Sequence, residues 1–217
     1  MRFSFDKLKS MQSEIARQFR TGEIKFEDLK KIAGFDVTYD GDKAICAGVI
    51  LDAKTLEVIE KKIIIAKVPM NYVPGFLAFR EGPLILQAYY DFESDPDLLI
   101  ISGNGIAHPR RCGLATYIGV ELAKPAIGIA KSITGDLELK EGKVVLNGEI
   151  VGAELQTRDH ARPIIVSPGN MISLDSATEI IRKLIKFPHK MPEPLHIAHK
   201  IASKKLKEIR EKEKDKE

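Results

Sequence analysis

The sequence predicts one α/β domain in which helices pack against a mixed β-sheet. Three observations support this prediction: three β-rich runs near the N-terminus with short turns between them, a later alternation of short apolar runs with helix-like segments, and a length of 217 residues. Antiparallel strands followed by strand–helix–strand units are typical of a mixed sheet that has parallel members. Because single α/β units of about 200 to 250 residues are common, we expect one domain over residues 1–209 and a charged tail over residues 210–217.

The first part of the chain is expected to form a helix and three antiparallel strands. Apolar residues recur at helical spacing, which predicts an amphipathic helix over residues 5–20. These residues are Phe5, Leu8, Met11, Ile15 and Phe19. β-rich runs follow at residues 32–39, 44–51 and 58–68, and turn-forming Asp-Gly-Asp and Asp-Ala-Lys-Thr segments separate them.

The next part alternates helices with strands. A helix is expected over residues 79–90, with Pro83 in its first turn, where a missing N–H is tolerated. A strand at 98–102, a helix at 114–122 and a strand at 126–130 follow. This alternation predicts the parallel part of the sheet.

The last part is expected to close the sheet and cover it. The Asn-Gly pair at 147–148 predicts a hairpin over 144–152, and an apolar run at 164–166 predicts a strand that ends at Ser-Pro-Gly. Helices are expected over 173–186 and from Glu193 toward Ile209. Alternating charges over 210–217 predict a solvated, fraying end.

Composition and charge exclude several classes of protein. The net charge of +3 is too small to indicate nucleic-acid binding by itself. Nowhere do about 18 uncharged apolar residues run together, so neither secretion nor a membrane span is expected. Cys46 and Cys112, the only two cysteines, lack CxxC spacing, which favours a reduced, cytoplasmic protein. The helices show no sustained heptad pattern, so we expect a monomer.

One tract predicts a functional surface. The apolar run at 98–101 leads through Ser102 into a glycine-rich turn and then into a cluster of cationic and titratable side chains. Ligands of α/β sheets bind beyond the carboxyl ends of the strands, and glycines let a ligand approach the backbone closely. The cluster contains His108, Arg110 and Arg111. The alternative is a glycine turn beside a solvated basic loop.

Two carboxylates stand in positions that require an explanation. Asp36 lies inside an apolar strand, where an ionised group needs a partner such as a divalent metal, an Arg or Lys, or backbone amides. Glu81 opens the predicted helix and is alternatively a first-turn stabiliser. If both converge with the end of strand 98–102, they form a magnesium site suited to phosphodiester hydrolysis.

Several sequence blocks carry a resemblance to a known family. The blocks are Ile32-Ala33-Gly34-Phe35-Asp36, residues 72–83 (YVPGFLAFREGP), residues 103–110 (GNGIAHPR), residues 127–132 (IGIAKS), residues 166–169 (VSPG) and residues 192–194 (PEP). In combination they resemble successive motifs of endonuclease V over nearly the whole chain. The resemblance implies a ribonuclease-H-like fold and a Mg²⁺-dependent nuclease, with Mn²⁺ as the alternative ion. Its implied action is to recognise hypoxanthine in deoxyinosine, or inosine in RNA, and cut the second phosphodiester bond on the 3′ side.

The resemblance also implies catalytic roles for particular residues. Asp36 and Glu81 are expected to be metal ligands, and His108 is expected near the attacking water or the scissile phosphate. Lys131 is expected to contact a phosphate group and balance its charge. Without the resemblance, the alternative is a surface cation at a strand end. His199, one helical turn after His196, becomes a candidate neighbour of the metal.

Substrate-binding residues are implied in the same way. Tyr72 lies in the loop that resembles the family's wedge and is expected to insert into the helix while the base is flipped out. Its alternative role is loop packing. Gly75, Gly103 and Gly105 are expected to let backbone groups approach the base, and Arg80 is placed with them as a substrate-binding residue.

Two positions depart from the family pattern. Asn71 stands where the wedge loop usually has a proline. Ser102 stands where the family has an aspartate, and a serine brings no negative charge to a metal site. We therefore expect weaker metal binding and reduced cleavage. A catalytically impaired protein that binds inosine-containing nucleic acid and a general ribonuclease-H-like nuclease remain the alternative functions.

Overall fold

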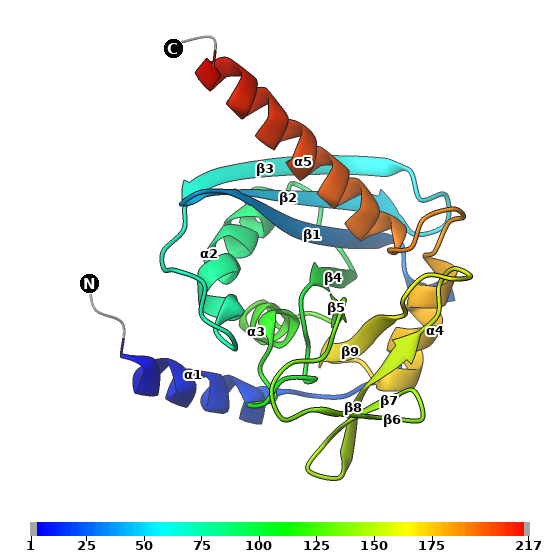
Figure 1. Cartoon of the computed structure of the whole chain (residues 1–217). Helices are drawn as coiled ribbons and strands as arrows, with labels where there is room; N and C mark the ends of the chain where they lie inside the picture. The colour runs from blue at the N-terminus through cyan, green and yellow to red at the C-terminus, as the bar shows by residue number, and fades with distance from the viewer. Residues whose placement is uncertain (1–3, 215–217) are drawn as a thin grey trace.

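A computed structural model describes residues 4–214 (Figure 1). Nine strands form one sheet in the order β3-β2-β1-β4-β5-β9-β8-β7-β6. They are β1 (Lys31–Asp40), β2 (Lys43–Asp52), β3 (Val58–Lys67), β4 (Leu98–Ser102), β5 (Ala126–Ala130), β6 (Glu138–Lys140), β7 (Lys143–Leu146), β8 (Glu149–Leu155) and β9 (Ile164–Asn170). Strands β1, β4 and β5 are parallel and the other neighbours pair antiparallel, so the predicted mixed α/β class is confirmed.

Helices cover both faces of this sheet. They are α1 (Phe5–Gln18), α2 (Leu77–Tyr90), α3 (Leu114–Glu121), α4 (Leu174–Lys183) and α5 (Glu193–Lys214), with a short 3₁₀ turn η1 (Phe26–Asp28). Figure 1 shows α5 crossing one face over β1 and β2, while α2 and α3 lie on the other face. Helix α1 packs beside α3, and α4 lies next to β9.

Alternation along the central strands produces the two hydrophobic layers. Successive side chains of a strand point to opposite faces, and Phe35 and Ile101 pack into the layer formed with α2 and α3. Their neighbours Ile32 and Ile100 pack into the second layer, formed with α4 and the first turn of α5. Both faces of β1 and β4 are therefore buried, which explains why these strands read as continuous apolar runs.

A buried glycine explains how α5 reaches the sheet. A Cβ added to Gly34 on β1 would lie 2.5 Å from backbone atoms of Pro194 at the start of α5. The absence of a side chain therefore lets the helix backbone sit directly on the strand. This close approach positions the first turns of α5 beside the carboxyl-terminal half of β1.

The predicted elements are present, but several boundaries differ. Helix α2 begins at Leu77, so Pro83 lies in its second turn rather than its first, where it leaves the Phe79 carbonyl without an intrahelical donor. Strand β9 does not end at the Ser-Pro-Gly segment but continues to Asn170. Proline is tolerated there because β8 pairs only with residues 164–166, which leaves that side of Pro168 without a ladder partner.

The two ends of the domain also differ from expectation. The short strand β6 was not predicted, whereas the hairpin of β7 and β8 turns at Asn147 and Gly148, both with positive φ, as predicted. Helix α5 continues to Lys214 instead of fraying from residue 210. Ion pairs of 2.8 Å from Arg210 to Asp40 and of 2.7 Å from Lys43 to Glu213 hold this part of the helix to the β1–β2 hairpin. Residues 215–217 of the predicted tail lie outside the described residues.

Within residues 4–214, no helix combines the length and the apolar character needed to cross a membrane.

Candidate active site

Two neighbouring parallel strands bring Asp36 and Ser102 to the same edge of the sheet. Phe35 on β1 pairs with Ile101 on β4. The next residue on each strand is Asp36 and Ser102, respectively, and β4 ends there while β1 continues to Asp40. The side chain of Asp36 is 13% exposed, so its carboxylate lies in a largely enclosed position that opens beyond the end of β4.

Helix α2 adds a second carboxylate to this edge. Glu81 is buried and accepts a hydrogen bond from the hydroxyl group of Tyr39 on β1. Burial raises the pKa of Glu81 to about 7; the Tyr39 hydrogen bond opposes this, and the negative charge of Asp36 adds to it. The two carboxylates therefore act on each other, as like charges do when they share a site.

Arg80 offsets part of this negative charge. Its guanidinium carbon lies 4.4 Å from the centroid of the Tyr39 ring, and its Nη1 donates to the Met70 carbonyl at 2.8 Å. The side chain is buried. Arg80 therefore ties the loop that carries Tyr72 to the acidic edge, and it favours the charged form of Glu81.

Helix α5 supplies a histidine to the same edge. The Nδ1 atom of His199 lies 2.8 Å from Oδ2 of Asp36, and the histidine side chain is 63% exposed. His196, one turn earlier, instead stacks on His189 with 3.5 Å between ring centroids. Of the two helical histidines considered from the sequence, only His199 contacts a carboxylate of this edge. We call Asp36, Glu81, Ser102 and His199 the catalytic edge.

The glycine-rich loops form a second part of the site, without carboxylates, around the carbonyl group of Gly75. This carbonyl accepts hydrogen bonds from Gln12 Nε2 at 3.0 Å, from His108 Nε2 at 3.1 Å and from Arg110 Nη2 at 2.6 Å. Gly75 has a φ of +80°, a conformation that favours glycine. We call these four residues the Gly75 network.

Hydrogen bonds fix the protonation state of His108. The backbone N–H of Arg110 donates to Nδ1 at 3.2 Å, so the proton resides on Nε2, which donates to the Gly75 carbonyl. Burial lowers the pKa of His108 to about 4, and the charge of Arg110 acts in the same direction. At neutral pH His108 is therefore a neutral side chain that orients the Gly75 loop, and its expected role near the phosphate stays a prediction.

A small pocket lies beside the Gly75 network. Its wall includes Tyr72, Gly75, Asn104, His108 and Thr134, and its volume is about 70 Å³. Tyr72 is 64% exposed, which leaves it free to move. The Oδ1 atom of Asn104 is buried and has no hydrogen-bond partner among the described residues. An unpartnered buried acceptor is costly, and its position in a pocket wall suits a ligand that brings a donor.

The backbone N–H groups of the other two glycines in the tract over residues 103–110 form hydrogen bonds within the protein. The N–H of Gly103 donates to the carbonyls of Ile101 and Ile129, both at 2.9 Å, and the N–H of Gly105 donates to Ser167 Oγ at 2.8 Å. A Cβ on Gly105 would lie 2.0 Å from the Pro168 carbonyl oxygen. These N–H groups are therefore occupied, and the glycines permit tight packing of the loop against β9.

Lys131 directly follows β5 at the carboxyl end of the parallel strands, the edge that also carries Ser102. Its side chain is exposed. This position is compatible with the phosphate contact implied by the resemblance, and that role stays a prediction.

Three residues of the site escaped the sequence analysis. Tyr39 gave no signal beyond its place on β1. Gln12 gave a signal, because its spacing from Leu8 and Ile15 places it on the buried face of α1. Met11 was expected on that face, but its side chain is 37% exposed. Asn104 lies between two glycines, and only the glycines were predicted to be site residues. An amide side chain beside a strand end is nevertheless of a type that binds ligands.

The donor set at the catalytic edge is small. Across the described part of the chain, no group of three or more His, Cys, Asp or Glu side chains is arranged to hold a metal ion. Ser102 stands where a third carboxylate was expected. The edge therefore offers two carboxylates, whose mutual repulsion a cation would relieve, and one histidine in contact with the first of them.

This mixed sheet flanked by helices is the ribonuclease-H-like fold that the sequence resemblance implied. A sequence model described as Endonuclease V matches residues 13–200. The chain belongs to the endonuclease V family, and it is accordingly a nuclease, that is, a hydrolase.

Individual relatives agree with this assignment. The chain is 40% identical to Endonuclease V of Dictyoglomus thermophilum over 209 residues, which covers 93% of this chain and 91% of that protein. The structure of Endonuclease V from Bacillus subtilis superposes with a TM-score of 0.88 at 32% identity, covering 98% and 95% of the two chains. A Ciona intestinalis Endonuclease V, solved with DNA that contains an inosine followed by a ribo-adenosine, has the same fold (TM-score 0.84, 24% identity, 94% and 98% covered).

Proposed function

We propose that this protein is a DNA-repair endonuclease that recognises deoxyinosine and hydrolyses the second phosphodiester bond on the 3′ side of the lesion. Inosine in RNA is a further substrate of the same site. The observation that carries the proposal is the pairing of Asp36 with Glu81 at the end of the parallel strands, beside the pocket of the Gly75 network. The Ciona relative with inosine-containing DNA supports the choice of lesion, and the cleaved bond follows from the family resemblance.

The pocket wall suits hypoxanthine better than adenine. Hypoxanthine carries a proton on N1, where adenine has a lone pair, and its 6-oxo group replaces the adenine amino group. The unpartnered Oδ1 of Asn104 is an acceptor for that N1 proton. A base must leave the stack to reach such a pocket, and weakly paired bases leave at the lowest cost.

The exposed Tyr72 is the group that admits the base. A cavity of about 70 Å³ holds about two water molecules, so the loop must move before a purine enters. The same movement brings the Tyr72 ring toward the duplex, where an inserted side chain replaces part of the lost stacking. The Gly75 network anchors the far end of this loop, three residues after Tyr72, while Tyr72 moves.

The residues at the catalytic edge fit a divalent cation. Asp36 and Glu81 would hold Mg²⁺ or Mn²⁺, oxygen ligands of the type these ions prefer, and relief of their repulsion favours binding. When bound, the ion supplies Lewis-acid stabilisation of the scissile phosphate and a more acidic attacking water. His199 orients the Asp36 carboxylate, Tyr39 orients Glu81, and Lys131 attracts the phosphate.

Ser102 weakens this arrangement. Its hydroxyl group provides no negative charge at the position next to Asp36, so the cation loses a strong ligand. We infer that lesion recognition is retained while cleavage requires more metal. We further propose that the protein acts as a monomer in the cytoplasm, which accords with two free, buried cysteines.

A nicking assay on matched duplexes tests this function. The two duplexes differ only in adenine or deoxyinosine at one position, and each is incubated with Mg²⁺ and with chelator. We expect Mg²⁺-dependent nicking of the deoxyinosine strand alone. Asp36→Asn and Glu81→Gln should abolish nicking, whereas Glu121→Gln, which removes an exposed carboxylate at the end of α3, should leave it unchanged.

Each other outcome favours a different function. Equal cutting of both duplexes indicates a general ribonuclease-H-like nuclease. Tight binding of the deoxyinosine duplex without nicking at any metal concentration indicates an impaired binding protein. Nicking that persists in chelator contradicts the metal-assisted mechanism.

A further inference from the structure

A groove outside the pocket and the catalytic edge is lined by Gln156, Thr157, Arg158, Asp159, Arg182 and Phe187. It consists of two adjoining hollows of about 300 Å³ and about 460 Å³, which share Gln156, Thr157 and Phe187. We call it the Phe187 groove. Neither the pocket nor the catalytic edge uses any of these residues.

The groove lies at the same edge of the sheet as the catalytic residues. Ala130 at the end of β5 pairs with Ile165, and Leu155 at the end of β8 pairs with Ile164. The loop over residues 156–163 therefore leaves the sheet at the level where β5 ends and Lys131 follows. A strand held at Lys131 has this loop next to it.

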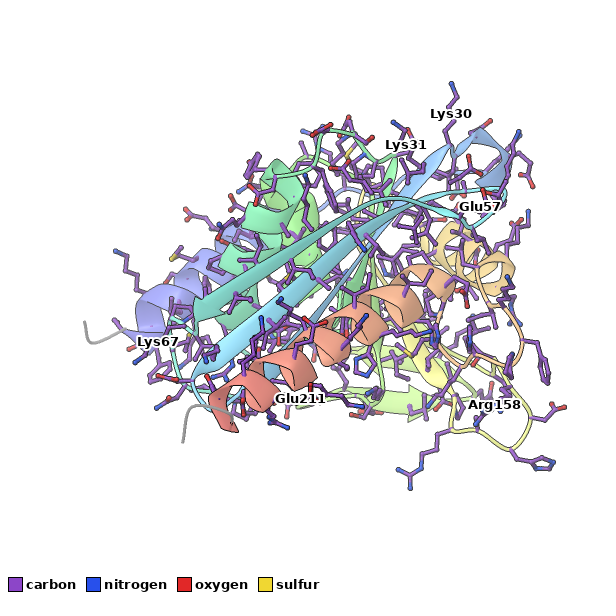
Figure 2. All side chains as sticks on the ribbon, turned by 90° about the horizontal axis from the view of Figure 1, so that it is seen from above. Lys30, Lys31, Glu57, Lys67, Arg158 and Glu211 are labelled. Atoms are coloured by element: carbon purple, nitrogen blue, oxygen red, sulfur yellow. The ribbon has the colours of Figure 1, made fainter. Side chains whose placement is uncertain are left out.

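A row of histidines joins the groove to Asp36 from the other side. His199 contacts Asp36, His196 lies one turn earlier on α5, and the ring of His189 stacks on His196. Phe187 precedes His189 by two residues. These contacts lead from Asp36 to within two residues of Phe187. Figure 2 shows α5 running across β1 and β2, with Glu211 toward one end and Arg158 on a loop beyond the other end.

The side chains of the groove combine one aromatic ring with unpaired positive charge. Phe187 is 87% exposed, the largest value among the exposed large apolar side chains of the described residues. Arg158 and Arg182 are exposed, and neither has a carboxylate within ion-pair distance among residues 4–214. Asp159 is the single acidic residue in the lining. A ring flanked by free guanidinium groups matches a nucleobase and its phosphates.

The loop of the groove is held in shape by its own hydrogen bonds. Gln156 Nε2 donates to the carbonyl of Arg158 at 2.5 Å and to that of Ala161 at 2.8 Å. Beside it, the hydroxyl group of Thr157 is buried without a partner among the described residues. The groove thus has a backbone that its own hydrogen bonds hold in shape, which limits the entropy lost when a ligand binds.

We propose that the Phe187 groove binds the part of the substrate strand that extends beyond the catalytic edge, with one base stacked on Phe187 and its phosphates at Arg158 and Arg182. This inference rests on the proposed function, because the strand is the one that the catalytic edge cuts. It adds a contact that is independent of the lesion base. The groove therefore contributes affinity and sets a minimum substrate length, without contributing to inosine selectivity.

The test compares substrate lengths in the full-length protein. Deoxyinosine strands are shortened stepwise from each end, and KM and kcat are measured for wild type, Phe187→Ala and Phe187→Trp. Stacking of one base is worth about 1–3 kcal/mol, so Phe187→Ala should raise KM on the long strand by about 5-fold or more with kcat unchanged. Phe187→Trp should retain the wild-type KM. On strands too short to reach the groove, all three proteins should have equal KM.

Two matched controls accompany this series. Tyr90→Ala removes another exposed aromatic ring, 71% exposed, at the end of α2 that faces away from the catalytic edge, and it should leave KM unchanged. In a variant with both Arg158→Ala and Arg182→Ala, the slope of log K against log salt concentration should fall in magnitude by about one to two, because one or two phosphate contacts are lost.

The inference is overturned if Phe187→Ala leaves KM on the long strand unchanged, or raises it equally on long and short strands. A change of oligomeric state in Phe187→Ala, measured by light scattering, also overturns it and assigns the ring to a contact between copies. If wild type cuts no inosine strand, the proposed function fails. Binding of a fluorescent strand to wild type and Phe187→Ala then still tests the groove separately.

Discussion

The catalytic edge and the Gly75 network lie close together but are built on opposite principles. In the Gly75 network one carbonyl accepts three hydrogen bonds, from Gln12, His108 and Arg110. At the catalytic edge burial raises the pKa of Glu81 to about 7, and the negative charge of Asp36 adds to this rise. The first region is held together by its own hydrogen bonds, whereas the second keeps a buried carboxyl group whose charged form is disfavoured.

This difference assigns separate tasks to the two regions. A network of hydrogen bonds that converge on one carbonyl holds a fixed shape, which suits recognition of a base. A buried carboxyl group whose charged form is disfavoured gains from a cation, which favours that form, and this suits catalysis. Substitutions in the network should therefore change stability and selectivity, and substitutions at the edge should change the metal requirement.

The largest effect is expected from restoring a carboxylate at the catalytic edge. Ser102→Asp should lower the Mg²⁺ concentration for half-maximal nicking by roughly 10- to 100-fold, because a charged ligand is added beside Asp36. A nicking assay over a Mg²⁺ series measures this. Ser10→Asp, which adds the same charge on the exposed face of α1, is the control. Equal metal requirements for Ser102→Asp and wild type would contradict the explanation given for this position.

The next effect is expected from breaking the Gly75 network. Gln12 is fully buried, donates to the Gly75 and Cys112 carbonyls at 3.0 and 2.9 Å, and accepts from Arg110 Nε at 2.7 Å. Gln12→Ala should lower the free energy of unfolding by about 2 kcal/mol, because it leaves buried groups unpaired.

Urea unfolding and deoxyinosine binding measure the Gln12→Ala effect together. Binding should weaken while the Mg²⁺ requirement of the remaining activity stays the same. Gln87→Ala, on the exposed side of α2, should be silent in both measurements. A changed metal requirement in Gln12→Ala would show that the two regions are not separate.

A third effect concerns pH and His108. Because burial lowers the pKa of His108 to about 4, the unfolded chain binds this proton more readily than the folded protein below about pH 6.5. Stability is therefore lost as pH falls from about 6.5 toward 4, by about 1–2 kcal/mol at pH 5 from this residue. Glu81 acts in the opposite direction. Because its pKa is raised, its contribution to the free energy of unfolding is lost as pH rises from its unfolded pKa to about 7.

The comparison with His108→Gln separates these contributions. Urea unfolding of wild type and His108→Gln is measured at pH 7.5, 6 and 5. The stability difference between the two proteins should narrow as pH falls, because only wild type must exclude the histidine proton. A difference that is constant over this range would rule out a neutral, buried His108.

The smallest effect is expected at Tyr39. Its hydroxyl group donates to Glu81 and favours the charged carboxylate, so Tyr39→Phe should raise the Glu81 pKa further. Loss of one such hydrogen bond corresponds to a rise of roughly 3- to 10-fold in the Mg²⁺ requirement near pH 7. The effect should disappear well above pH 8, where the carboxyl group is ionised in both proteins.

Tyr89→Phe is the matched control for Tyr39→Phe. Tyr89 donates to Asp95 at 2.9 Å at the other end of α2, away from the catalytic edge. It should leave the Mg²⁺ requirement unchanged at every pH. The same change of the Mg²⁺ requirement in both variants would show that the effect does not depend on the hydrogen bond from Tyr39 to Glu81.

Local patterns were enough to predict most of the elements. The Asn-Gly turn at residues 147–148, the apolar runs of β4 and β5, and the helical spacing in α1 each depend on residues a few positions apart. Boundaries were less predictable. Strand β9 passes through a proline because β8 pairs with it only as far as Val166, and α5 is held to the β1–β2 hairpin by the contact of Arg210 with Asp40. Neither contact is local in sequence.

The sequence by itself determined the mixed α/β class and the family, because the strand and helix periods and the endonuclease V motifs lie in short segments. It also named part of the candidate site. Only the tertiary structure decided what those residues touch. It turned His108 toward Gly75, placed His199 on Asp36, paired Tyr39 with Glu81 and left Asn104 unpartnered. These contacts join segments as far as 163 positions apart. They depend on how helices pack on the sheet, which no local pattern specifies.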